Sequence, residues 1–165
     1  MTTFILTVVF DLVIAIEVGM VLAAMLFMKR MSEETEIQGW KYLDDENDPD
    51  SITLKMVPQN TRVYEISGPL FFGAADKILN ITSKEGDKVL ILRMRSVTAI
   101  DATAMHSLED LWKDCNKKGI QLILSHVNEQ PMKVMKKSLF LSKIGKINCC
   151  GNIDEALKRA EELQK

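Results

Sequence analysis

The sequence VLILRMRSVTAIDATAMHSLEDL, at residues 89–111, contains the strand, loop and helix around which this chain is expected to fold. An almost continuous apolar run covers residues 88–94, which is typical of a central strand covered on both faces. Apolar side chains then recur with helical spacing over residues 103–117. Gly119 stands just past them, where glycine commonly ends a helix. The side chains on the predicted inner face of this helix are Ala104, Leu108, Leu111, Trp112 and Cys115.

The chain beyond this helix continues to alternate between strand and helix. Residues 120–125 (IQLILS) form a second buried apolar run, and residues 147–149 have the length of a short edge strand. Pro131 stands at the favoured first turn of a helix that extends to residue 138. A last helix is predicted from Asn152, a favourable N-cap, to residue 163, with acidic residues in its first turn.

The chain before the central strand predicts an antiparallel hairpin and one more helix. Residues 51–57 alternate in polarity, residues 62–67 resume an extended pattern, and the PQNT segment between them supplies a turn. The next helical face is formed by Phe71, Ala74, Ala75, Ile78 and Leu79. Together these elements predict an α/β domain with a central mixed sheet and about four helices, in which right-handed crossovers join the parallel strands.

The apolar run FILTVVFDLVIAIEVGMVLAAMLFM, at residues 4–28, ends at Lys29 and Arg30. As a helix it would be about 37 Å long, enough to cross a hydrocarbon core of about 30 Å with some tilt. A secretory signal is excluded because no basic segment precedes the run, the run is too long, and no small-residue cleavage site closes it. We therefore expect a transmembrane helix over residues 1–30. The basic pair behind it places the rest of the chain in the cytoplasm.

Two acidic residues, Asp11 and Glu17, interrupt the apolar run. Each costs about 2.5–3.5 kcal/mol near the centre of a membrane helix, and their spacing places them about 120° apart around it. One interpretation is that this helix packs among other membrane helices and lines a polar interior. The other is a long amphipathic helix of a soluble core, with both acids solvated. We favour the membrane interpretation because apolar residues surround the helix instead of forming one stripe.

Charge divides the rest of the chain into two parts. Residues 31–62 contain eight acidic and three basic residues, whereas residues 63–165 contain 13 acidic and 16 basic residues. The run DDENDPD, at residues 44–50, is expected to resist ordering, so residues 31–50 are predicted to be an acidic linker. Residues 51–165 are then long enough for one compact domain. The overall balance of 21 basic and 23 acidic residues gives no sign of nucleic-acid binding.

The loop between the central strand and the following helix carries the sharpest candidate site. Asp101 or Thr103 can cap the helix by accepting a hydrogen bond from a free backbone amide. The Thr103 hydroxyl would also lie where the helix dipole favours an added phosphate. On chemistry alone, an ordinary helix cap is the better supported interpretation.

Other candidate chemistry is sparse. The sequence contains no phosphate-binding loop, dinucleotide fingerprint, zinc-ligand spacing or nucleophile elbow, so we expect no catalytic residue, no metal and no cofactor. Cys115 is expected in the core. The adjacent Cys149 and Cys150 are either redox-active or, as we favour, ordinary reduced thiols. A candidate surface for a cytoplasmic partner comprises Phe72, His106, Lys133, Lys136 and Lys137, although a solvated helix face is the simpler explanation of the lysines.

The segment VYEISGPLFFG, at residues 63–73, and the later residues 89–111 resemble a STAS domain, the module of sulfate transporters and anti-sigma factor antagonists. In the antagonists an Asp-Ser-Ser-Gly element carries the phosphorylated serine. The resemblance assigns Thr103 to the phosphorylatable position after Asp101, and Ala104 stands in place of the glycine. Residues 6–31 are similar to the last transmembrane helix of SulP-family anion permeases, which leads directly into a C-terminal STAS domain.

This resemblance implies the C-terminal part of a secondary anion transporter of the sulfate type, in the cell inner membrane, with its STAS domain in the cytoplasm. The domain would serve regulation, folding and protein contacts. Its expected partners are the remaining transmembrane helices of the transporter and a second copy in a homodimer. Because the upstream helices that hold the substrate site are missing from this sequence, we do not expect the chain to transport alone. The alternative is a membrane-tethered signalling protein of the anti-sigma factor antagonist type, switched at Thr103.

Overall fold

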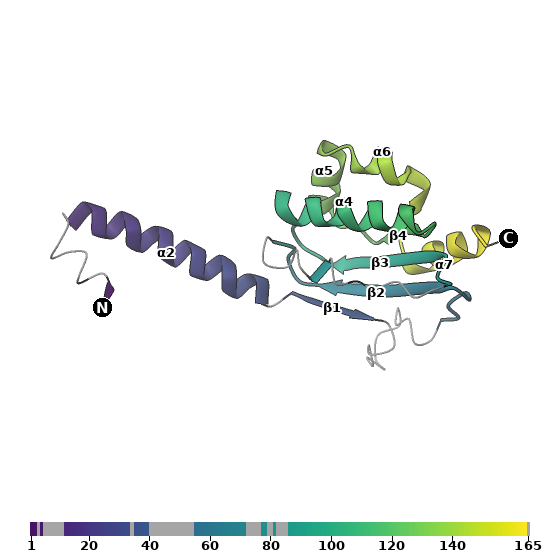
Figure 1. The fold of residues 1–165 in the computed structure, drawn as a ribbon, viewed down its shortest axis with the longest axis horizontal. Helices are drawn as coiled ribbons and strands as arrows, with labels where there is room; N and C mark the ends of the chain where they lie inside the picture. Colours follow the sequence, from purple (N-terminus) through teal and green to yellow (C-terminus); the bar gives the residue numbers. More distant parts are fainter. Residues whose placement is uncertain are drawn as a thin grey trace.

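The computed structural model describes residues 1–2, 4, 12–33, 35–39, 55–71, 77–78, 81 and 86–164. Figure 1 shows α4, α5 and α6 grouped above one face of a sheet and α2 extending away from it. The elements in chain order are α2 (Leu12–Glu33), β1 (Glu36–Gly39), β2 (Thr61–Ser67), β3 (Val89–Ser96), α4 (Ala102–Lys117), β4 (Gln121–Ser125), α5 (Glu129–Lys137), α6 (Phe140–Ile144), the 3-10 helix η4 (Lys146–Asn148), β5 (Cys149–Cys150) and α7 (Ile153–Glu162).

Five strands in the order β1-β2-β3-β4-β5 form the centre of the domain. β1 is antiparallel to β2, and every other neighbouring pair is parallel. The apolar run at the start of β3 is buried on both faces of the sheet, so the predicted central strand is confirmed. The mixed sheet of an α/β domain is confirmed as well.

Two apolar clusters attach helices to the two faces of the sheet. Leu90 and Leu92 of β3 belong to the larger cluster, which includes the inner faces of α4, α5 and α6. Val89 and Ile91 belong to the smaller cluster with the inner face of α7. The alternation follows from the period of two in a strand, because successive side chains point to opposite faces. On α4, Ala104, Leu108, Leu111 and Cys115 are buried as predicted, and Trp112 is half-buried with its ring edge-on to Phe140.

The opening hairpin has a different first strand from the predicted one. β1 pairs with β2 from Glu36 opposite Ser67 to Gly39 opposite Tyr64, whereas residues 55–57 belong to no strand and residues 51–54 lie outside the described residues. The sheet therefore begins within residues 31–50, which the charge pattern assigned to a linker. Tertiary contacts select the strand, since the Thr35 hydroxyl just before β1 donates a hydrogen bond to the Pro69 carbonyl at 2.6 Å. Residues 40–50 also lie outside the described residues.

α5 and α7 lie where the sequence predicted C-terminal helices, and two short helices, α6 and η4, were not predicted. α7 begins after Asn152, whose side chain accepts a hydrogen bond from the Glu155 backbone amide at 2.9 Å, as predicted for an N-cap. The short edge strand predicted at residues 147–149 is present as β5, which starts two residues later, and residues 147–148 belong to η4 instead. α6 was not predicted, because its five residues are too few to show helical periodicity. Of the helix predicted after Gly68-Pro69, residues 77–78 are helical and most of the rest lies outside the described residues.

The N-terminal helix α2 carries many exposed apolar side chains. Val13, Val21 and Leu26 are each more than half exposed, and Glu17 is exposed among them. Within the part of the chain that the structure describes, no helix is both long and apolar enough to cross a membrane. Asp11 and its neighbours at residues 5–10 lie outside the described residues.

Candidate functional site

The loop from β3 to α4 ends in a helix cap formed by Asp101. One carboxylate oxygen of Asp101 accepts a hydrogen bond from the Ala104 backbone amide at 2.8 Å. Thr103 lies in the first turn of α4 with its side chain exposed. Of the two alternatives for the cap, the structure therefore selects Asp101, and the exposed Thr103 lies near the positive end of the helix dipole.

Two neighbouring segments hold this loop in place. The Leu70 amide donates to the Ala99 carbonyl at 2.8 Å, and the Asp101 amide donates to the Leu70 carbonyl at 3.0 Å. From the other side, the side-chain amide of Asn128 donates to the carbonyls of Arg95 and Val97 at 2.8 and 2.7 Å. This clamp fixes where α4 begins relative to the sheet.

Gln130 completes the clamp from the first turn of α5. Its side-chain oxygen accepts a hydrogen bond from the Ile100 amide at 2.9 Å. Asn128 and Gln130 were not among the sequence-predicted site residues. An asparagine before a proline-containing helix signals only a local cap, and the contact with a loop 30 residues earlier is tertiary.

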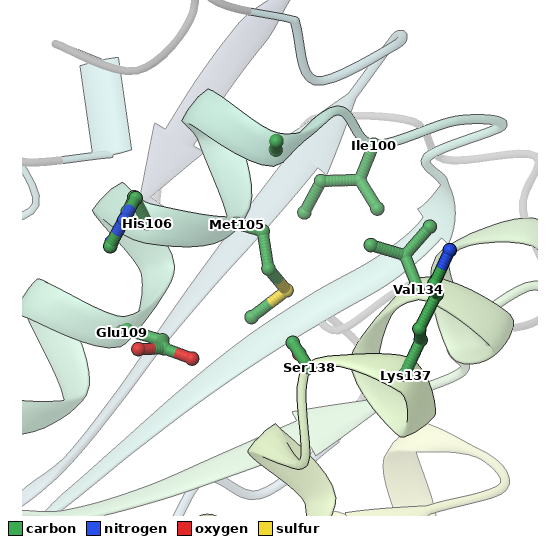
Figure 2. Close-up of a pocket in the computed structure, with 8 residues that line it drawn as sticks. Ile100, Met105, His106, Glu109, Val134, Lys137 and Ser138 are labelled. Atoms are coloured by element: carbon green, nitrogen blue, oxygen red, sulfur yellow. The ribbon is translucent and has the colours of Figure 1, made fainter.

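A groove of about 460 Å³ lies between α4 and α5. Figure 2 shows Met105 pointing into it from α4, with Ile100 and Val134 across from it. His106 and Glu109 lie on the α4 side and Lys137 on the α5 side. The groove is thus apolar at its floor and charged at its rim, a typical arrangement for a binding surface.

The structure brings together several residues of the predicted partner surface. His106 and Lys137 line the same groove, and Lys133 and Lys136 are exposed on α5 beside it. Lys133 makes a surface ion pair with Glu129 at 2.7 Å, one turn earlier on the same helix. Phe72 lies outside the described residues, and Glu17 is on α2, away from this groove.

The three cysteines are all free thiols, and Cys115 is buried in the core as predicted. Burial raises the pKa of Cys115 to about 11 and that of Cys149 to about 11. Burial also raises the pKa of Cys150. A raised pKa keeps a thiol protonated near neutral pH, so this environment disfavours a reactive thiolate. Among the described residues, no group of histidine, cysteine, aspartate or glutamate could hold a metal ion.

A buried charge cluster lies on the opposite face of the sheet and was not predicted. The Glu65 carboxylate of β2 accepts hydrogen bonds from Arg93 at 3.0 Å and Arg95 at 2.7 Å, both on β3. Arg93 is only 2% exposed and Glu65 only 4%. The next position in register on β4 is Ser125, whose buried hydroxyl has no hydrogen-bond partner among the residues that the structure describes. The sequence signal was weak, because two arginines at the end of an apolar strand are typical of an exposed strand end.

The sheet, the capped loop and the helical layers are those of a STAS domain. The family model of the STAS domain matches residues 53–156, and the chain belongs to this family. It is 33% identical over 93% of its length to YvdB of Bacillus subtilis, which carries the name of a sulfate transporter. The chain spans 28% of the length of that relative.

Two solved structures extend the comparison. The crystal structure of a sulfate transporter family protein from Wolinella succinogenes is 40% identical with a TM-score of 0.67, covering 72% of this chain and 98% of that one. Murine Solute Carrier 26 family member A9, an anion transporter, is 14% identical with a TM-score of 0.65, covering 98% of this chain and 28% of that one. The second likeness concerns the fold alone. With these relatives, the chain looks like the STAS portion of a SulP-family transporter.

Proposed function

We propose that this chain is the C-terminal portion of a secondary anion transporter of the sulfate type. The observation that carries the proposal is that the relatives match the N-terminal helix and the domain in one continuous alignment. One relative aligns with 93% of the chain and the anion transporter fold with 98%, so both matches include the N-terminal helix as well as the domain. The relatives are transporters rather than enzymes, and we propose no catalytic role.

The N-terminal helix supports this proposal through its surface. Exposed apolar side chains lie on several sides of α2, and an apolar surface of this extent requires cover by lipid or by other helices. We propose that residues 1–30 pack in the inner membrane against the remaining transmembrane helices of the transporter. In that arrangement Asp11 and Glu17 would face a polar interior, and Lys29 and Arg30 would place the domain in the cytoplasm.

The STAS domain would then serve regulation, folding and protein contacts, including those of a homodimer. It follows the membrane segment directly, because only residues 34–35 separate α2 from β1. Such a short connection couples the domain mechanically to the last helix. A change in the domain can therefore be transmitted to the membrane part through few residues.

The size of the native protein tests the proposal. An antibody raised against residues 63–165 should detect a membrane protein several times heavier than the 18.7 kDa of this chain. A band near 19 kDa would instead indicate a complete one-helix protein. In the full transporter, replacement of Asp11 and Glu17 by alanine should reduce anion uptake while the amount of protein in the membrane is unchanged. Unchanged uptake would refute their interior role.

The tethered signalling protein remains the second candidate, favoured by the position of Thr103. Thr103 is exposed in the first turn of α4, where the positive end of the helix dipole would favour a phosphate. Mass spectrometry of the native protein should then find phosphate on Thr103. A Thr103 that is unmodified under every growth condition would remove this candidate.

A further inference from the structure

We propose that the groove between α4 and α5 binds an acidic amphipathic helix of a protein partner. The inference rests on the proposed role of the STAS domain in protein contacts and gives that role a location and a ligand chemistry. Four features carry it: the shape of the groove, the charge around it, the exposed leucine beside it and the apolar floor.

The groove has the shape expected for a helix. On α4 its lining residues are Ala102, Met105, His106 and Glu109, which are spaced by three or four residues and so form one face over two turns. At the end of α5 the lining residues Val134, Lys137 and Ser138 cover one further turn. The groove therefore follows α4 for about 10 Å, roughly two turns of a docked helix, and α5 for about one turn.

The charge beside the groove is positive. Residues 129–148, from α5 to η4, contain five lysines and one acidic residue, Glu129. Glu109 on the opposite rim is already paired with Lys143 at 3.1 Å. In the described part of the chain, Lys136 and Lys137 are exposed and make no ion pair, and Lys137 lines the groove, so its charge is available to an incoming partner. An acidic partner is complementary to this surface.

An exposed leucine beside the groove has an unusual backbone conformation. Leu139 directly follows Ser138 of the groove lining, has φ of 60° and is 66% exposed. A left-handed conformation is costly for leucine, and exposure of its side chain to water adds to the cost. Within the free domain neither cost is offset by burial. Burial of Leu139 against the apolar face of a docked helix would offset the cost of exposing its side chain to water.

A flat lipid surface fits these features less well. Lysines beside an exposed leucine suit anionic headgroups too, but the groove is a hollow between two helices, which a planar surface would bridge without filling. A convex apolar ridge can enter this hollow and contact the half-buried Val134. The shape thus favours a helix over a membrane.

Binding of a designed peptide tests the inference. The probe is a fluorescent helical peptide of about 18 residues with leucines on one face and glutamates on the other. Its controls are a scrambled peptide of the same composition and a peptide with lysine in place of glutamate. The full 165-residue chain is held in nanodiscs of phosphatidylcholine, and fluorescence anisotropy reports binding.

We expect the acidic amphipathic peptide to bind and both control peptides to bind about tenfold more weakly. The Lys137→Glu and Leu139→Ser variants should each weaken binding by about tenfold. Lys158→Glu is the matched control, because Lys158 is exposed on α7 across the sheet and its replacement makes the same change in net charge. Circular dichroism checks that every variant is folded.

Equal binding of the three peptides, or equal effects of Lys137→Glu and Lys158→Glu, would overturn the inference. A lipid surface would be indicated by two results together. The peptide would not bind, and residues 129–148 would be protected from hydrogen exchange in nanodiscs of phosphatidylglycerol but not in nanodiscs of phosphatidylcholine. Failure here leaves the transporter proposal intact, because the native size and the uptake assay decide that proposal separately. A native band near 19 kDa, in turn, leaves the peptide result unaffected.

Discussion

At the scale of single residues, Leu139 combines a left-handed backbone with an exposed side chain. Asparagine adopts this conformation more readily, so Leu139→Asn should raise the free energy of unfolding by about 0.5–1 kcal/mol. Leu139→Ala is the control, because alanine keeps the backbone penalty and should give no gain. Urea titration followed by circular dichroism measures both. A less stable Asn variant would show that the leucine is held by contacts within the domain.

Glu65 is the residue on which the buried charge cluster depends, since its carboxylate accepts hydrogen bonds from both Arg93 and Arg95. Glu65→Ala removes one partner of a buried ion pair and should cost about 3–5 kcal/mol. Glu162→Ala removes the exposed pair with Arg159 and should cost less than about 1 kcal/mol. Chemical denaturation measures the free energy of unfolding of the two variants. Similar losses of stability would mean that the Arg93 guanidinium is stabilised by partners other than Glu65.

The thiols give a prediction with a defined pH direction. Cys115 and Cys149 each have a pKa raised by burial from 9.0 to about 11, so the folded chain holds their protons more tightly than the unfolded chain. Their contribution to stability is therefore complete below about pH 9 and is lost as the pH rises toward about 11. Unfolding free energies measured from pH 8 upward should fall across this window. A Cys115→Ala, Cys149→Ala double variant should show a smaller fall.

At the scale of elements, the cap of α4 is set by a single side chain. Asp101→Ala removes the acceptor for the Ala104 amide and should destabilise the domain by about 1 kcal/mol. Asp101→Asn retains an acceptor and should recover most of this loss. Asn152→Ala tests the equivalent cap of α7 and should cost a similar amount. Thermal unfolding measures all three, and an unaffected Asp101→Ala would mean that the clamp from Asn128 and Gln130 alone fixes the helix start.

Elements with a strong local pattern were predictable, and elements set by distant contacts were not. The apolar run of β3 and the helical spacing of α4 place those two elements within one residue of their observed start or end. β1 has four residues and is selected by pairing with β2, so the more regular alternation of residues 51–57 was misleading. The candidate site also combines features set by local sequence with features set by distant contacts. The cap at Asp101 is local, whereas the groove and the Glu65 cluster exist only when separate elements pack together.

At the scale of the whole molecule, the apolar surface is concentrated on one helix. The exposed apolar side chains of the described chain include a large group on α2, while the domain buries its own in two clusters. This distribution predicts that α2 attaches the chain to the membrane and that the domain does not need α2 in order to fold. Among the residues that the structure describes, neither apolar cluster of the domain includes a residue of α2.

Deletion of residues 1–30 tests this division. If the N-terminal helix is held by lipid as proposed, the full chain should remain in the membrane pellet after an alkaline carbonate wash. Residues 31–165 should then be recovered in the supernatant, with the circular dichroism spectrum of a folded domain. Leu139→Ser in the truncated chain separates the two apolar surfaces. If the truncated chain still pellets and Leu139→Ser releases it, the domain reaches the membrane through the groove between α4 and α5. That outcome would move membrane attachment from the helix to the face that we assign to a protein partner.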